Sequence, residues 1–255
     1  MSIVSFDAVV ALAGRQASED IFTSLLLSQA TLIVAADGGA DCVIRLGYVP
    51  NLVVGDFDSI EGGRKRLLHE STKKMVFSAD KSHTDGELAL AVAVLRSLGK
   101  KIPEEEFALY AEFKACGDLT GMSLLFLNCF GSRQDHTLAN IALAVLAARR
   151  GANVFMTDGM TLGRVIVGPR TLIPVFHRDY FVRAGSRRFL FSAQPLDDRV
   201  SGLTIKGLRW ELVDVSLPLT RALALSNYAH TNHPDNVRID CRQGTLALFT
   251  FPETL

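Results

Sequence analysis

The sequence contains little cysteine, no long apolar run and no excess of charge of either sign. Its 255 residues include four cysteines, and 27 basic residues balance 27 acidic ones. No two cysteines have C-x-x-C spacing, which argues against a zinc site and favours reduced thiols. Zero net charge gives no reason to expect a nucleic acid or an anionic membrane as partner. The apolar segment from Ala8 to Ala13 is too short for a signal-peptide core, so we expect a cytoplasmic protein.

What the sequence does contain is a pair of carboxylates two residues apart, Asp56 and Asp58, at the end of an apolar run. Val53 and Val54 predict the end of a buried parallel strand, and Gly55 lets the backbone turn. Ligands bind at the carboxyl ends of strands in open α/β sheets, so the two carboxylates can converge there on one cation. Oxygen-only ligation of this kind suits Mg²⁺. The alternative is a solvated turn in which the Asp side chains cap the chain reversal.

A second strand end carries an acid and two glycines. The run from Leu32 to Ala36 predicts another buried strand, and Asp37, Gly38 and Gly39 follow it. Glycines at such a position allow a phosphate or nucleotide to approach the backbone closely. Taken alone, the same pattern is also typical of a simple turn.

Two further polar segments precede predicted helices. Residues 81–85 lead into an apolar helix, where Thr84 or Asp85 could simply be the N-cap. The second segment offers one basic, one acidic and one titratable side chain: Arg133, Asp135 and His136. The positive end of a helix favours anions, which makes this segment a candidate phosphate site. The alternative is a surface ion pair between Arg133 and Asp135, with His136 as a capping partner.

The order of the predicted elements indicates an α/β protein with two domains. In the first half, apolar strands alternate with helices, which argues for a Rossmann-like parallel sheet covered on both faces. After about residue 158, short alternating runs predict an all-β domain, most simply a sandwich. We therefore expect an α/β domain over residues 1–160 and a small β-sandwich domain over residues 161–255. The predicted strands are 8–13, 32–36, 52–54, 124–129, 164–167, 180–183, 188–192, 203–205, 221–226, 237–240 and 245–251, and the predicted helices are 21–29, 40–46, one from 86 and one from 137.

Taken together, the motifs of the first half resemble those of the thiamine pyrophosphokinase family. The family's A-D-G-G-A segment matches residues 36–40, and its P-x-L/I-x-x-G-D-F-D-S segment matches residues 50–59. Residues 81–85 resemble its K-D-x-T-D segment, and residues 131–136 resemble its G-G-R-x-D-H segment. The second of these four matches, with its distance from the first, is the most specific.

The second half adds two matches, and the whole chain shows three departures. Residues 204–210 look like the family's T-x-x-G-L-K-W segment, and residues 225–227 look like the tail of its S-x-S-N segment. Ser82 stands where the pattern has its first Asp, which removes one potential carboxylate. Ser132 replaces the second glycine of G-G-R. Ala224 replaces the first serine of S-x-S-N and loses a possible hydrogen bond.

The resemblance implies a reaction and assigns roles to residues. The family transfers the β,γ-pyrophosphoryl group of ATP to the hydroxyl of thiamine and leaves AMP, with Mg²⁺ as cofactor. Asp56, Asp58 and Asp85 would ligate Mg²⁺, whereas Asp37 would either join them or accept the hydroxyl proton. Arg133 would contact phosphate oxygens, which its guanidinium fork matches. The remaining residues that the resemblance assigns to the nucleotide are Gly38, Gly39, Lys81, Thr84, Asp135 and His136.

The resemblance places thiamine against the second domain. Trp210 would stack on the pyrimidine ring, and Ser226 and Asn227 would form hydrogen bonds to it. The alternatives are a core role for the single tryptophan and a plain turn role for Ser226. The family works as a homodimer with sites shared between chains, so the same is implied here. Residues 100–121 look like a surface insertion relative to the family, and we assign no chemistry to their glutamates.

Two other functions are compatible with some of these residues. A Mg²⁺-dependent phosphatase or sugar-nucleotide transferase would also use a D-x-D pair, but it leaves the other motifs without an explanation. A degenerate family member would bind thiamine or its diphosphate without turnover. Ser82 and Ala224 are the residues that favour this second alternative.

Overall fold

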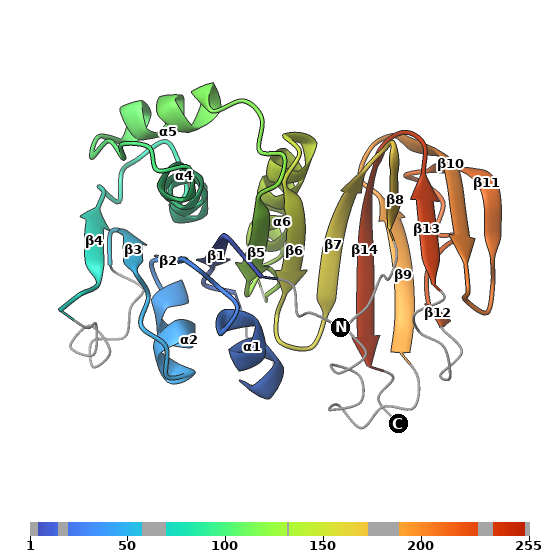
Figure 1. Cartoon of the computed structure of the whole chain (residues 1–255), viewed down its shortest axis with the longest axis horizontal. Helices are drawn as coiled ribbons and strands as arrows, with labels where there is room; N and C mark the ends of the chain where they lie inside the picture. Colours follow the sequence, from blue (N-terminus) through green and yellow to red (C-terminus); the bar gives the residue numbers. More distant parts are fainter. Residues whose placement is uncertain are drawn as a thin grey trace. The chain divides into compact units, whose positions relative to one another are not determined.

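The computed structural model of the chain describes residues 5–14, 20–57, 70–131, 133–172, 189–228 and 237–252. The chain has a mixed α/β fold, with a large, mostly parallel sheet and a separate antiparallel sheet. It divides into two compact units, residues 1–159 and residues 160–255. Figure 1 shows the elements of both units, coloured along the sequence.

The first unit contains a parallel sheet with the order β4-β3-β2-β1-β5-β6. Every residue of β1, β2 and β3 is buried. Because helices cover both faces of such a sheet, its central strands are continuous apolar runs instead of alternating ones. The strands are β1 (Ala8–Ala11), β2 (Ile33–Ala36), β3 (Leu52–Gly55), β4 (Lys73–Val76), β5 (Ser123–Leu127) and β6 (Asn153–Thr157).

Helices α1 and α2 lie on one face of this sheet, and α4 lies on the other face with α5 outside it (Figure 1). Helix α4 is buried at every position from Leu88 to Leu95, since the sheet covers one side and other helices cover the rest. The helices described in this unit are α1 (Asp20–Leu27), α2 (Gly39–Arg45), α4 (Asp85–Ser97), α5 (Glu106–Ala115) and α6 (Gln134–Arg149). No helix in the described ranges combines the length and hydropathy that a bilayer crossing requires.

The strand order reverses direction at β1, which lies between β2 and β5. The loops at this point pack without spare room. A Cβ added at Gly39 would lie 2.1 Å from the carbonyl oxygen of Ala11, and one at Gly14 would lie 2.1 Å from that of Asn128. Such a reversal opens a crevice outside the carboxyl ends of the strands, where ligands bind in sheets of this type.

The second unit is built from antiparallel strands. One set has the order β7-β14-β9-β12, and the other has the order β11-β10-β13-β8. The strands are β7 (Leu162–Val167), β8 (Arg170–Leu172), β9 (Phe189–Pro195), β10 (Arg199–Lys206), β11 (Leu212–Pro218), β12 (Asn227–Tyr228), β13 (Arg238–Cys241) and β14 (Thr245–Pro252).

One predicted strand is wrong, and helix α6 begins three residues earlier than predicted, whereas α1, α2 and α4 each begin one residue earlier. Residues 221–226 form no strand; they turn, and Ser226 has a φ of 54°, which interrupts extended backbone immediately before β12. Helix α6 begins at Gln134 instead of Thr137, so Asp135 and His136 belong to its first turn. The predicted run 180–183 lies outside the described residues. The four cysteines are free, with Cys116 partly exposed and the others buried.

Candidate active site

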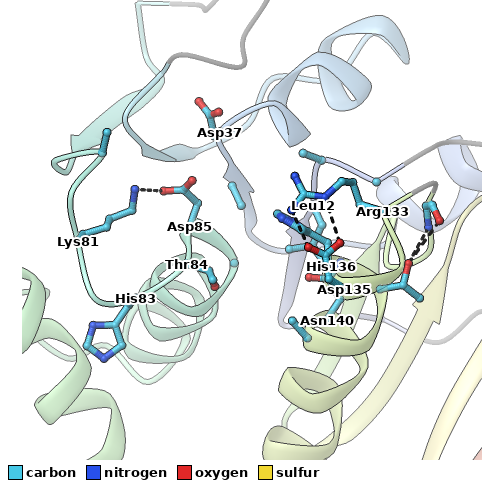
Figure 2. Close-up of a pocket in the computed structure, with 18 of the residues that line it drawn as sticks. Leu12, Asp37, Lys81, His83, Thr84, Asp85, Arg133, Asp135, His136 and Asn140 are labelled. Carbon is cyan, nitrogen blue, oxygen red and sulfur yellow. Dashed lines mark hydrogen bonds and ion pairs between the residues drawn. The ribbon is translucent and has the colours of Figure 1, made fainter.

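A pocket of about 670 Å³ lies at the carboxyl ends of the parallel strands of the first unit. Its lining comes from the loops after β1 and β2 and from the segments that lead into α4 and α6. In Figure 2, Asp37, Lys81 and Asp85 lie on one side of this pocket, and Arg133, Asp135 and His136 lie on the other. The pocket therefore lies where the reversal of strand order predicts a ligand site.

Three carboxylates converge beside this pocket. Ligand oxygens of Asp37, Asp56 and Asp85 all lie within 4.8 Å of one another. Asp37 follows β2, Asp56 follows β3, and Asp85 is the first residue of α4. Gly55 leaves room for them, because a Cβ there would lie 2.9 Å from the Cβ of Asp37 and 3.2 Å from Oδ1 of Asp85. Asp58, the other acid of the D-x-D pair, lies outside the described residues.

The carboxylates of this cluster act on one another electrostatically. Burial raises the pKa of the Asp85 carboxyl, Lys81 opposes that rise, and the charges of Asp37 and Asp56 add to it. Asp37 is only 4% exposed and adopts a φ of 41°, which few side chains other than Asn and Asp tolerate. Oxygen ligands that repel one another in a sheltered position fit a hard divalent cation, which would neutralise them.

Lys81 forms an ion pair with Asp85, with its Nζ 3.1 Å from Oδ1. Its side chain is only 8% exposed, and it lines the pocket. Figure 2 shows this pair on the side of the pocket nearest Asp37. Lys81 therefore supplies positive charge in the pocket, as binding of an anion requires.

The structure shows Thr84 as the N-cap of α4. Its hydroxyl accepts a hydrogen bond from the Glu87 N–H at 3.2 Å, and its own N–H donates to Oε2 of Glu87 at 2.8 Å. This reciprocal capping box fixes the start of the helix and with it the position of Asp85. Ser82, which stands where the family pattern has an Asp, is exposed and lines the pocket.

The opposite side of the pocket is more open. Arg133 donates to both carboxylate oxygens of Asp135, at 3.0 and 2.6 Å. Their side chains are 70% and 64% exposed. The hydrogen bonds from Arg133 hold the pKa of Asp135 well below its usual range. The ion pair that was the alternative interpretation of these residues is thus present, at a position that lines the pocket together with His136.

The residues predicted for thiamine lie in the second unit. Trp210 is 56% exposed, so a core role for it is wrong. Asn227 is buried; its Oδ1 accepts the N–H of Trp210 at 3.1 Å, and its Nδ2 donates to the Trp210 carbonyl at 2.7 Å. Ser226 is exposed, and its backbone N–H donates to the Ser192 hydroxyl. Asn227 therefore fixes the backbone of Trp210 and leaves the indole accessible.

Sequence reasoning missed part of the pocket. Leu12, Ala13 and Gly14 line it but carry no reactive groups, so only the prediction that β1 ends there points to them. Asn140, in the second turn of α6, also lines the pocket and donates from Nδ2 to the Cys129 carbonyl at 3.1 Å.

Two named thiamine pyrophosphokinases are similar to most of this chain in sequence. It is 24% identical over 199 residues to the thiamine pyrophosphokinase of Bacillus subtilis (strain 168), covering 77% of this chain and 78% of that one. It is 23% identical over 225 residues to thiamine pyrophosphokinase 2 of Oryza sativa subsp. japonica, covering 82% and 75% of the two chains.

Solved structures share the fold. Thiamin pyrophosphokinase from Candida albicans has a TM-score of 0.75 at 17% identity, with 98% of this chain and 90% of that chain covered. A thiamin pyrophosphokinase family protein from Enterococcus faecalis has a TM-score of 0.67 at 18% identity, covering 97% and 99%. The family model described as thiamin pyrophosphokinase, catalytic domain, matches residues 23–156, which is more than half of the chain and includes the carboxylate cluster and the pocket segments that lead into α4 and α6. The chain therefore belongs to the thiamin pyrophosphokinase family.

Proposed function

We propose that this chain transfers the pyrophosphoryl group of ATP to the hydroxyl of thiamine, with thiamine diphosphate and AMP as products. The observation that carries the proposal is the convergence of Asp37, Asp56 and Asp85 within 4.8 Å beside a pocket that also holds Lys81 and Arg133. Clustered carboxylates next to cationic side chains suit a metal–triphosphate complex. Family membership and the names of the relatives support the same reaction.

The carboxylate cluster is proposed to hold Mg²⁺, with Asp58 as a further ligand from the D-x-D pair. The bound ion would neutralise charge on the triphosphate. The burial of Asp37 and its place in the cluster support a ligand role for it, in preference to a role as base for the thiamine hydroxyl. Asp56 and Asp85 would hold this ion from two neighbouring elements of the fold.

Cationic side chains are proposed to bind the phosphates directly. Lys81 already lines the pocket and would share its charge between Asp85 and a phosphate oxygen. Arg133 would exchange its contact with Asp135 for two hydrogen bonds to a phosphate. Phosphoryl-type transfer depends mainly on positioning and electrostatics, and these residues supply both. Gly38 and Gly39 would let the nucleotide approach the backbone after β2.

Thiamine is proposed to bind at Trp210. It is a flat cationic ligand, for which an exposed indole face is a suitable platform. Residues 1–160 would thus carry the nucleotide and metal, and residues 161–255, proposed as a β-sandwich, would carry thiamine. A homodimer with shared sites stays a prediction of the family resemblance, and a cytoplasmic location stays a prediction of the sequence.

The decisive experiment measures nucleotide products from ATP and Mg²⁺ with and without thiamine. Thiamine-dependent AMP is the expected result and would show that Ser82 is tolerated. Thiamine-dependent ADP would indicate a simple kinase instead. Thiamine binding without any nucleotide turnover would favour the degenerate binding protein. Phosphate release at the same rate with and without thiamine would favour a phosphatase.

A further inference from the structure

A single carboxylate oxygen of helix α5 binds the backbone of the pocket segment 81–85. Oε1 of Glu106 accepts the backbone N–H of Ser82 and that of His83, each at 2.9 Å. The same oxygen lies 2.7 Å from Nδ1 of His83. The next N–H along, that of Thr84, donates to Glu87. Three consecutive N–H groups of the segment are therefore held by two carboxylates, which leaves this backbone little freedom.

The side chains of the segment point in different directions, although His83 lines the pocket together with Lys81 and Asp85. The imidazole of His83 points away from Asp85 in Figure 2. It packs against Tyr110 of α5, with ring centroids 4.1 Å apart, and meets Phe107 edge-on at 5.8 Å. Lys81 and Asp85, two residues to either side of His83, form their ion pair on the pocket side. The side chains of His83 and Glu106 are only 15% and 13% exposed, so water competes weakly for their contact.

Helix α5 is itself firmly attached to the first unit. Leu109 and Phe113 of this helix are fully buried, and α5 packs on α4. Arg150, at the end of α6, donates to the carbonyls of Phe113 and Gly117 at 2.9 and 2.8 Å. Its guanidinium also lies 4.5 Å from the Phe113 ring centre. Glu106 therefore projects from a fixed support, as a residue that positions a loop must.

We propose that Glu106 is a positioning residue for the catalytic site: it holds residues 81–85 so that Lys81 and Asp85 face the metal and the triphosphate. The inference rests on the proposed function for the identity of the ligands. It also gives the segment 100–121 a role that its sequence, interpreted as a surface insertion, does not suggest. Ser82 lacks the carboxylate of the family pattern, and its backbone is instead tied to Glu106.

The test compares Glu106→Ala and Glu106→Gln with Glu112→Ala and Glu112→Gln in the full chain. Glu112 lies on the same helix, is 47% exposed and is 4.0 Å from Lys100, so it controls for loss of charge from α5. A misplacement of active-site groups by about 1 Å can lower catalytic efficiency about a hundredfold. Glu106→Ala should therefore raise KM for Mg·ATP at least about tenfold. KM for thiamine should stay unchanged. Glu106→Gln should recover part of the loss, since its Oε1 can still accept both N–H groups.

Binding of the Mg²⁺ complex of α,β-methylene-ATP, in which the bond between the α- and β-phosphates cannot be cleaved, is measured by calorimetry and separates this inference from the proposed function. If the unmodified chain makes no thiamine-dependent AMP but Glu106→Ala still weakens nucleotide binding, the function is wrong and the positioning role stands. If the chain is active and the Glu106 variants match the Glu112 variants, the positioning role is wrong. A fall in kcat with both KM values unchanged would also overturn it, because Mg·ATP would then bind as well as it does to the natural chain, with Lys81 and Asp85 not displaced. Should Glu106→Ala fail to fold, Glu106→Gln and His83→Ala carry the same comparison.

Discussion

The two walls of the pocket lead into helices in different ways. On the α4 side, Thr84 forms a full capping box, and the side chains of Lys81 and Asp85 are only 8% and 27% exposed. On the α6 side, the N-cap Arg133 makes no side-chain capping hydrogen bond, and its side chain is 70% exposed. Lys81 and Asp85 are thus sheltered on one wall, whereas Arg133 on the other wall is held by a solvated ion pair.

This difference indicates a division of labour. Side chains that are fixed before a ligand arrives lose little entropy on binding, so the α4 wall is suited to hold the metal and the ground-state triphosphate. An exposed arginine must give up its partner before it can bind phosphate, so the α6 wall is suited to contacts that form later in the reaction. Variants on the two walls should therefore affect different kinetic constants.

The largest effect is expected from Asp85→Asn on the α4 wall. Loss of a metal-site carboxylate should lower kcat/KM about a thousandfold, because the metal contributes several kcal/mol to phosphoryl transfer. Steady-state AMP production measures this. Asp7→Asn is the matched control, since Asp7 accepts the Ser123 N–H at the opposite, amino-terminal edge of the sheet. Normal turnover in a folded Asp85→Asn variant would overturn the assignment of the cluster.

The next comparison is between Lys81→Met and Arg133→Met. Lys81→Met should raise KM for Mg·ATP about tenfold, because it removes sheltered positive charge from the ground-state complex. Arg133→Met should instead lower kcat about tenfold or more, with KM little changed. The same AMP assay at varied Mg·ATP gives both constants. Identical changes in the two variants would remove the distinction between the walls.

A smaller effect is expected from Thr84→Ala. Loss of the N-cap hydroxyl should reduce the free energy of unfolding by about 1 kcal/mol, the usual cost of such a change. Urea denaturation measures it, and Thr84→Ser, which keeps the hydroxyl, should show almost no loss. Unchanged stability in Thr84→Ala would mean that Glu106 and Glu87 hold the start of α4 without the cap.

The smallest effect is expected from Asp135→Asn on the α6 wall. The pair with Arg133 is exposed, so thermal unfolding at pH 7 should be almost unchanged. The pKa of Asp135 is depressed, so whatever stabilisation the pair provides is present at neutral pH and lost as acid protonates it. Melting curves at low and high salt test this prediction. A large loss of stability at pH 7 would show that the protein holds the α6 wall in place as firmly as the α4 wall.

Much of the site could be predicted from short-range patterns. An acid after an apolar run and next to glycine points to a strand end, and this located Asp37 and Asp56. Capping preference suggested Thr84 or Asp85 as the helix start, and the structure selects Thr84. These successes share one cause, since in each case the relevant neighbours lie within a few residues along the chain.

The failures depend on contacts between distant parts of the chain. Glu106 binds residues 23 and 24 positions away, and nothing local distinguishes it from the two glutamates before it. Strand β4 was missed because two exposed lysines precede its one buried residue, Met75, and an exposed valine follows it, as occurs in edge strands. Residues 221–226 have the alternation of a strand, but Leu223 and Leu225 are exposed on a turn.

The backbone conformation and the burial of Asp37 affect the thermal stability of the molecule. Its backbone adopts a conformation that costs free energy, and its buried carboxylate lies among others of the same sign. Asp37→Asn would keep a side chain that tolerates this backbone and would remove the repulsion. Such a variant should have a higher melting temperature than the natural chain but should lose pyrophosphoryl transfer. Heat resistance is therefore a poor guide to competence among variants of this protein.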